Sequence, residues 1–202
     1  MKLYYSPGAC SLSPHIALLE AGLPFTTERV DIRGKKTASG GDYLAINSKG
    51  SVPALQLDDG SVLTEGAAIT QYIADQKPES GLAPRAGTLE RYRLMEILNY
   101  IASEVHKGFS PLFNPKASSD WKASAIAALG TKFDWLSKQL DGKSYLLGEQ
   151  FTIADAYLFT VLNWTSRVGI DLSKWPVLTA YQARVAARPK VQAAMQAEAA
   201  VS

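Results

Sequence analysis

Residues 52–75, VPALQLDDGSVLTEGAAITQYIAD, contain two short apolar runs, a turn between them and a helical pattern after them. The turn is Asp58-Asp59-Gly60, and an Asp-Gly pair between two strand-like runs predicts a β-hairpin. Beyond the hairpin, apolar residues recur at helical spacing at Ala68, Ile69, Tyr72 and Ile73. We therefore predict two strands and one helix, over residues 52–57, 61–64 and 67–75.

The residues before this hairpin alternate between strand-like and helix-like patterns. Lys2–Tyr5 and Phe25–Val30 predict strands, and Ser11–Ala21 between them predicts a helix. A brief helical turn is expected near residues 42–46, which gives the element order βαβαββα. We expect residues 1–77 to form one α/β domain.

The pattern becomes wholly helical after residues 76–84, where two prolines and a glycine among polar residues predict a linker. A first apolar stripe has helical spacing, at Leu94, Ile97, Leu98, Ile101 and Val105. Further helices are expected over 121–140 and 152–168, from 176, and after 189. We expect residues 85–202 to form an all-helical domain.

Thr152 and Asp155 stand three residues apart at the start of one of these helices. This spacing is typical of a capping box, in which the two residues bond to each other's backbone at the N-terminus. We expect the pair to cap a buried helix and so to stabilise the folded protein.

Charge balance and the single cysteine limit the possible functions. The 202 residues carry 21 Lys and Arg against 19 Asp and Glu, and this balance excludes binding to nucleic acid through its phosphates. One cysteine allows no internal disulfide and suits a reducing compartment. The first residues lack the apolar run of a signal peptide, and no stretch has the length of a membrane span. We expect a soluble cytoplasmic protein with no nucleic-acid or membrane partner.

Cys10 lies between the first strand and the first helix. Partial positive charge at a helix N-terminus stabilises a thiolate, so this position favours a reactive thiol. The alternative is a small buried apolar residue, which is the usual role of a cysteine without a disulfide. The tetrad Cys-Ser-Leu-Ser has no second thiol, so redox chemistry would use a mixed disulfide with an external thiol.

Two further positions in the first half carry candidate binding groups. Val52-Pro53 opens a strand where proline cannot donate to the ladder. A cis peptide there would turn the Val52 backbone toward an extended peptide ligand. Glu65-Gly66 precedes a helix, where N–H groups bind anions. The Glu65 carboxylate either binds a ligand's ammonium group or complements the helix dipole.

Asn99, Ser103 and His106 are spaced to share one face of an α-helix, opposite its apolar stripe. Such a face either lines a site or is simply solvated. The chain has only two histidines, and His15 within the first helix is expected to be structural.

Five segments in order resemble the glutathione transferases, most closely the bacterial beta class. They are KLYYSPGACSLS (2–13), KGSVPAL (49–55), LTEGAAI (63–69), NYIASEVHKGF (99–109) and FTIADAY (151–157). The beta class has cysteine where other classes have a catalytic tyrosine or serine. The resemblance covers the chain from Met1 to its last helix. It implies an N-terminal thioredoxin-like domain followed by an all-helical domain.

The resemblance also implies the role of each candidate residue. Cys10 would lie beside the glutathione sulfur, and His106 would position or polarise that sulfur. The implied glutathione site consists of Cys10, Lys35, Val52, Pro53, Glu65, Gly66, Asn99, Ser103, Glu104 and His106. Lys35 would meet the glycine carboxylate, Val52 the cysteinyl backbone, and Glu65 with Gly66 the γ-glutamyl end. Gly66 departs from many members of the family, which have serine there.

The implied pocket for the electrophile is aromatic and consists of Phe109, Phe113, Tyr157 and Trp164. Periodicity alone would place Tyr157 and Trp164 in the core. No metal is expected. Some of the pocket-lining residues would come from a partner subunit, since the family forms homodimers.

The reaction implied is conjugation of the glutathione thiolate to hydrophobic electrophiles, in detoxification or in aromatic and haloaromatic metabolism. Glutathione would be the co-substrate. One alternative is glutathione-dependent thiol-disulfide reduction through a Cys10 mixed disulfide. Another is a ligand-binding or transcription-associated relative without catalysis. The combination of Cys10, Glu65 and His106 argues against that last alternative, because a pure binder needs no thiol site.

Overall fold

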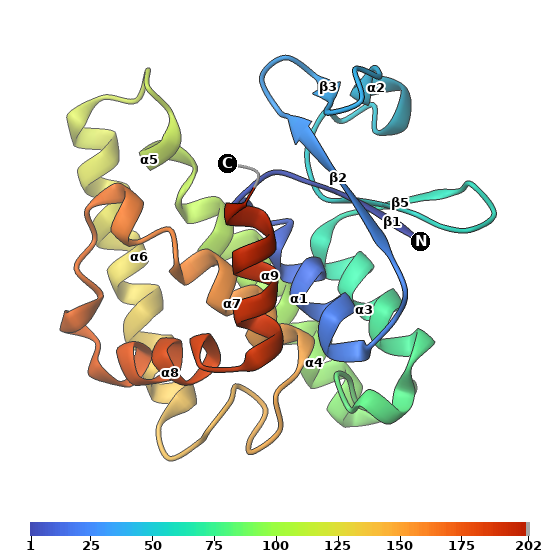
Figure 1. Ribbon diagram of the computed structural model, residues 1–202. Coiled ribbons are helices and arrows are strands. Elements are labelled where there is room, and N and C mark those ends of the chain that lie inside the picture. Colours follow the sequence, from blue (N-terminus) through green and yellow to red (C-terminus); the bar gives the residue numbers. More distant parts are fainter. Residues whose placement is uncertain (201–202) are drawn as a thin grey trace. The chain divides into compact units, whose positions relative to one another are not determined.

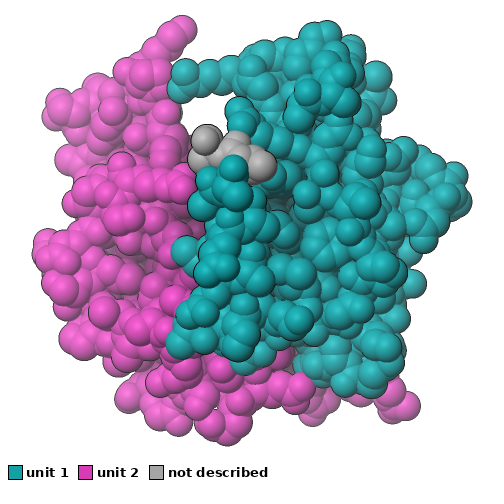
Figure 2. All heavy atoms as spheres, in the orientation of Figure 1, with its two compact units in different colours: residues 1–83, 187–202 teal, residues 84–186 magenta. Residues whose placement is uncertain are grey.

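The computed structural model describes residues 1–200 (Figure 1). Contacts divide the chain into two compact units, coloured separately in Figure 2. Unit 1 is Met1–Ala83 together with the segment that begins at Ala187, and unit 2 is Pro84–Ala186.

Unit 1 is built on a five-stranded sheet with the order β3-β2-β1-β4-β5. Strands β1 and β2 are parallel, and the other neighbours are antiparallel. The strands are β1 (Lys2–Tyr5), β2 (Thr26–Asp31), β3 (Lys36–Thr37), β4 (Ala54–Gln56) and β5 (Val62–Thr64). The predicted order βαβαββα is confirmed, with β3 added as a short edge strand of two residues. So short a strand shows no alternation, which is why the sequence does not predict it.

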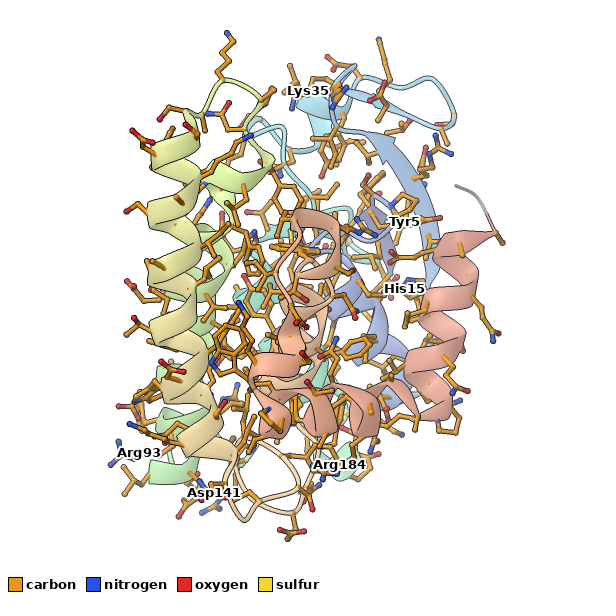
Figure 3. The ribbon with its side chains drawn as sticks, turned by 90° about the vertical axis from the view of Figure 1, so that its left-hand side faces the viewer. Tyr5, His15, Lys35, Arg93, Asp141 and Arg184 are labelled. Atoms are coloured by element: carbon orange, nitrogen blue, oxygen red, sulfur yellow. The ribbon has the colours of Figure 1, made fainter. Side chains whose placement is uncertain are left out.

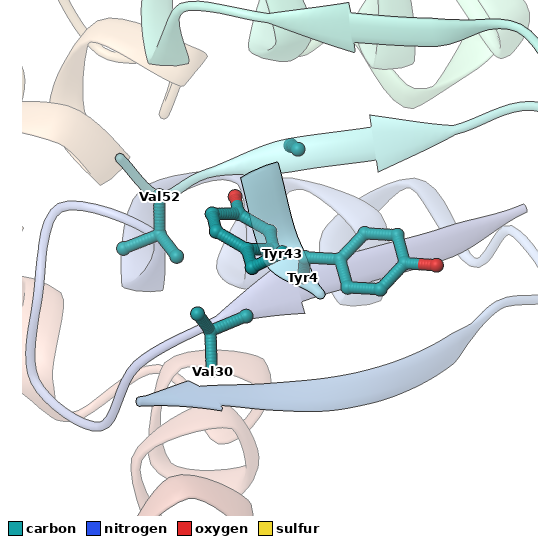
Figure 4. Packing of buried hydrophobic residues seen from close by; sticks show 5 residues of the cluster. Tyr4, Val30, Tyr43 and Val52 are labelled. Atoms are coloured by element: carbon teal, nitrogen blue, oxygen red, sulfur yellow. The ribbon is translucent and has the colours of Figure 1, made fainter. Parts of the chain in front are cut away.

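Both faces of this sheet are covered. Leu3 and Tyr4, which point to opposite faces of β1, are both buried. The helices are α1 (Leu12–Ala21), α2 (Tyr43–Ile46) and α3 (Gly66–Gln76), with a 3₁₀ turn at Pro78–Ser80. Helices α1 and α3 pack against each other below the sheet in Figure 1. The core cluster on the side of α2 consists of Tyr4, Val30, Tyr43, Val52 and Ala54 (Figure 4).

The last helix, α9 (Pro189–Ala199), packs against α1 and therefore belongs to unit 1 by its contacts. The Glu198 carboxylate accepts from the Gly8 N–H at 2.8 Å and bonds the buried His15 ring at 3.1 Å. His15 also packs beside Tyr5 (Figure 3). The sequence pattern instead predicts one domain over residues 85–202, because helical periodicity does not reveal which neighbour a helix packs against.

Unit 2 is helical, as expected. It contains α4 (Leu89–Tyr100), a π-helix (Ile101–His106), α5 (Ser110–Phe113), α6 (Ser119–Leu140), α7 (Ile153–Leu162) and α8 (Pro176–Ala186), with 3₁₀ turns at Ser166–Val168 and Leu172–Lys174. The predicted apolar stripe from Leu94 to Val105 is buried at every position. Helix α7 ends at Leu162, six residues before the predicted end at Val168, and the chain continues through a 3₁₀ turn closed by Gly169.

Helix α7 is the most buried element of unit 2, since all ten of its residues are buried. Asp155 accepts from the Thr152 N–H at 2.8 Å and from the Thr152 hydroxyl at 3.1 Å. The pairing of these two residues is therefore as predicted. The Leu146 N–H and the Tyr181 hydroxyl also donate to Asp155, at 2.9 and 3.0 Å. Burial raises the pKa of the Asp155 carboxyl, and these donors oppose that shift.

Within residues 1–200, none of the helices is both long enough and apolar enough to cross a membrane.

Candidate active site

Cys10 lies in the turn between β1 and α1, immediately before the N-cap residue Ser11. Ser11 joins the two ends of this turn. Its hydroxyl donates to the Ser6 carbonyl at 3.2 Å and accepts from the Ser6 N–H at 3.1 Å. The thiol is half-buried. The position before a helix N-terminus is therefore confirmed, and it is the kind of position that stabilises a thiolate.

The thiol lies against the loop that precedes β4. Val52-Pro53 is a cis peptide, and the Cys10 Sγ donates to the Val52 carbonyl at 3.2 Å. Tyr43 and Asn47 hold the loop by donating to the Ser51 carbonyl at 2.8 and 2.7 Å. Burial raises the pKa of Tyr43 to about 12, so its hydroxyl keeps the proton that it donates. Two segments 42 residues apart in the chain thus meet at the thiol.

Lys35 has a left-handed backbone (φ 55°), and its ammonium group donates to the Gly50 carbonyl at 2.7 Å. The resemblance assigned this lysine to a ligand carboxylate. The structure places its charge at the loop that continues to Val52.

Glu65 adopts a positive φ of 72° just before α3, which begins at Gly66. A positive φ is uncommon for a residue other than glycine, and strained backbone conformations of this kind cluster at functional sites. Its side chain makes no capping hydrogen bond and instead pairs with the ammonium group of Lys49. The side chain is 71% exposed. The carboxylate is therefore presented to an ammonium group and not to the helix backbone.

The helix that carries Asn99, Ser103 and His106 changes from α to π at Ile101. Hydrogen bonds in a π-helix join residue i to i+5, so each turn holds more residues than an α-turn. His106, five residues after Ile101, therefore lies on the same side of the π-helix as the buried Ile101. Asn99 and Ser103 are exposed. The expected shared face of these three residues is not formed. Glu104 is also exposed, and it pairs with the Lys132 ammonium group at 2.8 Å.

His106 belongs to an aromatic cluster in unit 2. Its Nδ1 lies 2.7 Å from the Tyr157 hydroxyl oxygen, and its ring lies 4.8 Å from that of Trp164 between centroids. Phe109 and Phe113 both meet Trp164 edge-on, at 5.5 and 5.7 Å. Phe113 is half exposed, while the other three predicted pocket residues are buried. The four residues predicted for an electrophile pocket thus lie in a single cluster that includes His106.

Three contacts in these sites are not predicted from the sequence: Lys49 with Glu65, Lys132 with Glu104, and Tyr157 with His106. The partners stand 16, 28 and 51 residues apart, so no local spacing could reveal them. Within the described residues, no three His, Cys, Asp or Glu side chains gather in a way that would hold a metal ion.

A thiol before a helix, set against a cis-proline loop on a mixed sheet, defines a thioredoxin-like domain. A family model described as the N-terminal domain of glutathione S-transferase matches residues 8–76. The model of the C-terminal domain matches residues 100–189.

Individual relatives agree with these models. Glutathione S-transferase GstA of Escherichia coli O157:H7 is 48% identical over 198 residues, 98% of each chain. A bacterial beta-class glutathione S-transferase structure from Sphingomonas chungbukensis is 52% identical, with 98% of each chain covered and a TM-score of 0.95. A sphingomonad glutathione S-transferase complexed with glutathione is 49% identical over 98% of this chain and 99% of that one, with a TM-score of 0.96. The chain belongs to the glutathione S-transferase family.

Proposed function

We propose that this glutathione transferase conjugates the glutathione thiolate to hydrophobic electrophiles, with glutathione held by unit 1. The observation that carries the proposal is the meeting of the Cys10 thiol with the Val52 carbonyl at 3.2 Å. The main chain before a cis-proline offers groups to which an extended peptide thiol can pair, and the helix N-terminus favours a thiolate beside it. A sphingomonad relative that is 49% identical has been solved with glutathione.

Glu65 is proposed to bind the α-ammonium group of the γ-glutamyl end. Lys49 already supplies an ammonium group to this carboxylate, so the chemistry of the contact suits such a ligand. Lys35 and Gly66 remain proposed partners of the glycine carboxylate and of the γ-glutamyl end. The contact between Lys35 and the Gly50 carbonyl keeps the lysine at the same loop as Val52.

In unit 2 we assign two roles to the aromatic cluster. His106 would stabilise the negative sulfur as a hydrogen-bond donor, and Phe109, Phe113 and Trp164 would supply apolar surface to the electrophile. Asn99, Ser103 and Glu104 are exposed, which suits contacts across a subunit boundary. The half-exposed Phe113 marks the side of the cluster that a substrate can reach.

Titration calorimetry with glutathione tests the proposal. The wild type should bind in the micromolar to millimolar range of a small polar ligand. Glu65→Gln removes the carboxylate charge and should weaken binding by about tenfold or more, because a hydrogen bond to a charged group contributes roughly 1.5–3 kcal/mol. Glu79→Gln is the matched control, since Glu79 is also an exposed lysine-paired carboxylate of unit 1. A wild-type protein that binds no glutathione would overturn the proposal.

We further propose a homodimer in the cytoplasm. Leu89 and Tyr92 stand on α4 with 66% and 60% of their surface exposed. Large apolar side chains exposed on one helix are typical of an interface, and closed twofold pairs are the commonest oligomers. The single cysteine suits a reducing compartment.

A further inference from the structure

One contact in unit 2 that the proposed function leaves unexplained joins Tyr157 to His106. The Tyr157 hydroxyl oxygen lies 2.7 Å from His106 Nδ1, a short distance for a hydrogen bond between these groups. The two rings meet edge-on, with an angle of 86° between their planes. Tyr157 is 4% exposed, so this hydroxyl is positioned by the core and not by solvent.

The direction of this hydrogen bond follows from the chemistry of its two groups. A phenol is a better donor than acceptor, while the unprotonated nitrogen of a neutral imidazole is a good acceptor. The Tyr157 hydroxyl therefore donates to Nδ1. A neutral imidazole carries one proton, so that proton resides on Nε2. In this tautomer Nε2 is a donor.

The surroundings hold the imidazole in one orientation. Tyr157 stands on α7, which is buried along its whole length and is fixed at its start by Asp155. Trp164 also packs against the imidazole, with the two ring centroids 4.8 Å apart and an angle of 72° between the ring planes. His106 itself ends the π-helix, a type of helix that is rare and is frequently found at functional sites.

We propose that Tyr157 is a positioning residue, which fixes His106 as the Nε2–H tautomer and holds its ring in one orientation, so that Nε2 is available to donate to an anionic sulfur. This inference rests on the proposed role of His106 in conjugation. Tyr157 is thereby distinguished from Phe109 and Phe113, whose side chains offer only apolar surface. Its ring packs in the core, and its hydroxyl acts on the imidazole.

The tautomer can be measured directly in the glutathione-free protein by long-range ¹H–¹⁵N NMR of the histidine rings. The chain has only two histidines, so comparison with His106→Gln assigns both sets of signals. The wild type should show His106 with an unprotonated Nδ1 and a protonated Nε2. Tyr157→Phe keeps the packed ring and should shift the His106 signals toward a mixture of tautomers. Tyr100→Phe is the control, because it removes a half-buried hydroxyl from the same unit while Tyr100 packs against Trp135.

Steady-state kinetics provide the second readout. Tyr157→Phe should lower kcat for conjugation by about fivefold, the loss expected from one neutral hydrogen bond, with less than about a twofold change in the KM for glutathione. Tyr100→Phe should change neither constant. A wild-type His106 protonated on Nδ1, or a Tyr157→Phe variant with the wild-type tautomer or wild-type kcat, would overturn the inference. Absence of any conjugation by the wild type would instead refute the proposed function and leave the NMR result standing.

Discussion

At the scale of single residues, the fold gives Lys35 and Glu65 positive φ angles and lowers the pKa of the Glu28 carboxyl. The position of Cys10 is predicted correctly, because a strand-to-helix turn is a local signal. The cis peptide at Val52-Pro53 does not follow from the sequence pattern alone, because most X-Pro bonds are trans. The left-handed backbones of Lys35 and Glu65 are not predictable, since neither residue favours a positive φ. These conformations are imposed by tertiary contacts.

Glu28 illustrates a residue whose protonation is set by the fold. The Ser39 hydroxyl, followed by Lys2 and Thr37, lowers the pKa of the Glu28 carboxyl from 4.5 to about 2. A depressed folded-state pKa gives stability that is present above the unfolded value and is lost as pH falls toward the folded value.

The difference in unfolding free energy between the wild type and Glu28→Gln should therefore be larger at pH 6 than at pH 3, and should be nearly gone close to pH 2. Urea denaturation at these pH values measures it. An equal difference at pH 6 and pH 3 would show that the carboxylate charge makes no such contribution.

At the scale of elements, prediction succeeds where a repeating pattern is long enough to be recognised. The hairpin of β4 and β5, helix α1 and the buried stripe of α4 follow from strand and helix periodicity. The two-residue β3 is too short to show a pattern. The π-helix is missed because one wider turn leaves the apolar spacing nearly unchanged, although it alters where His106 points. The site is therefore predicted less well than the fold.

The N-terminus of α7 carries the sharpest stability prediction. Asp155→Ala removes an acceptor for the Leu146 and Thr152 N–H groups and for the Tyr181 hydroxyl, all in the core. Stranded buried donors cost about 1–3 kcal/mol each, so we expect a loss of about 3 kcal/mol or more in unfolding free energy. Asp171→Ala is the control, because Asp171 caps a 3₁₀ turn in an exposed position and should cost about 1 kcal/mol or less.

Chemical denaturation of Asp155→Ala measures its loss of unfolding free energy, and its turnover rates with two different electrophiles measure its substrate selectivity. We expect the ratio of the two turnover rates to be unchanged. An Asp155→Ala protein of wild-type stability with an altered ratio would contradict the capping role.

At the scale of the whole molecule, each of the two units carries a different part of the proposed site. Unit 1 carries the thiol, the cis-proline loop and Glu65, while unit 2 carries His106 and the aromatic cluster. The near balance of acidic and basic residues argues against nucleic-acid binding, which stays a prediction. Which unit the last helix packs with is not encoded in any local pattern, and only the contact of α9 with α1 reveals it.

The assembly is predicted to be a homodimer of the 21.8 kDa chain. Light scattering at working concentration should give twice that mass. Tyr92→Glu places a charge on the exposed apolar face of α4 and should shift the mass toward the monomer. Met195→Glu, at another exposed apolar position, should leave the mass unchanged. A wild-type mass near 21.8 kDa would refute the dimer.

The central claim is that the glutathione thiolate, and not Cys10, is the nucleophile in conjugation. The most direct test is the steady-state rate of Cys10→Ala with a chloronitrobenzene acceptor and with a glutathione mixed disulfide. Conjugation should remain substantial, because the helix N-terminus, the Val52 backbone and His106 are still present. Thiol exchange should be abolished, because the only cysteine of the chain is gone and no other side chain can carry the mixed disulfide. A loss of conjugation as complete as the loss of exchange would contradict the account and would make Cys10 essential to both reactions.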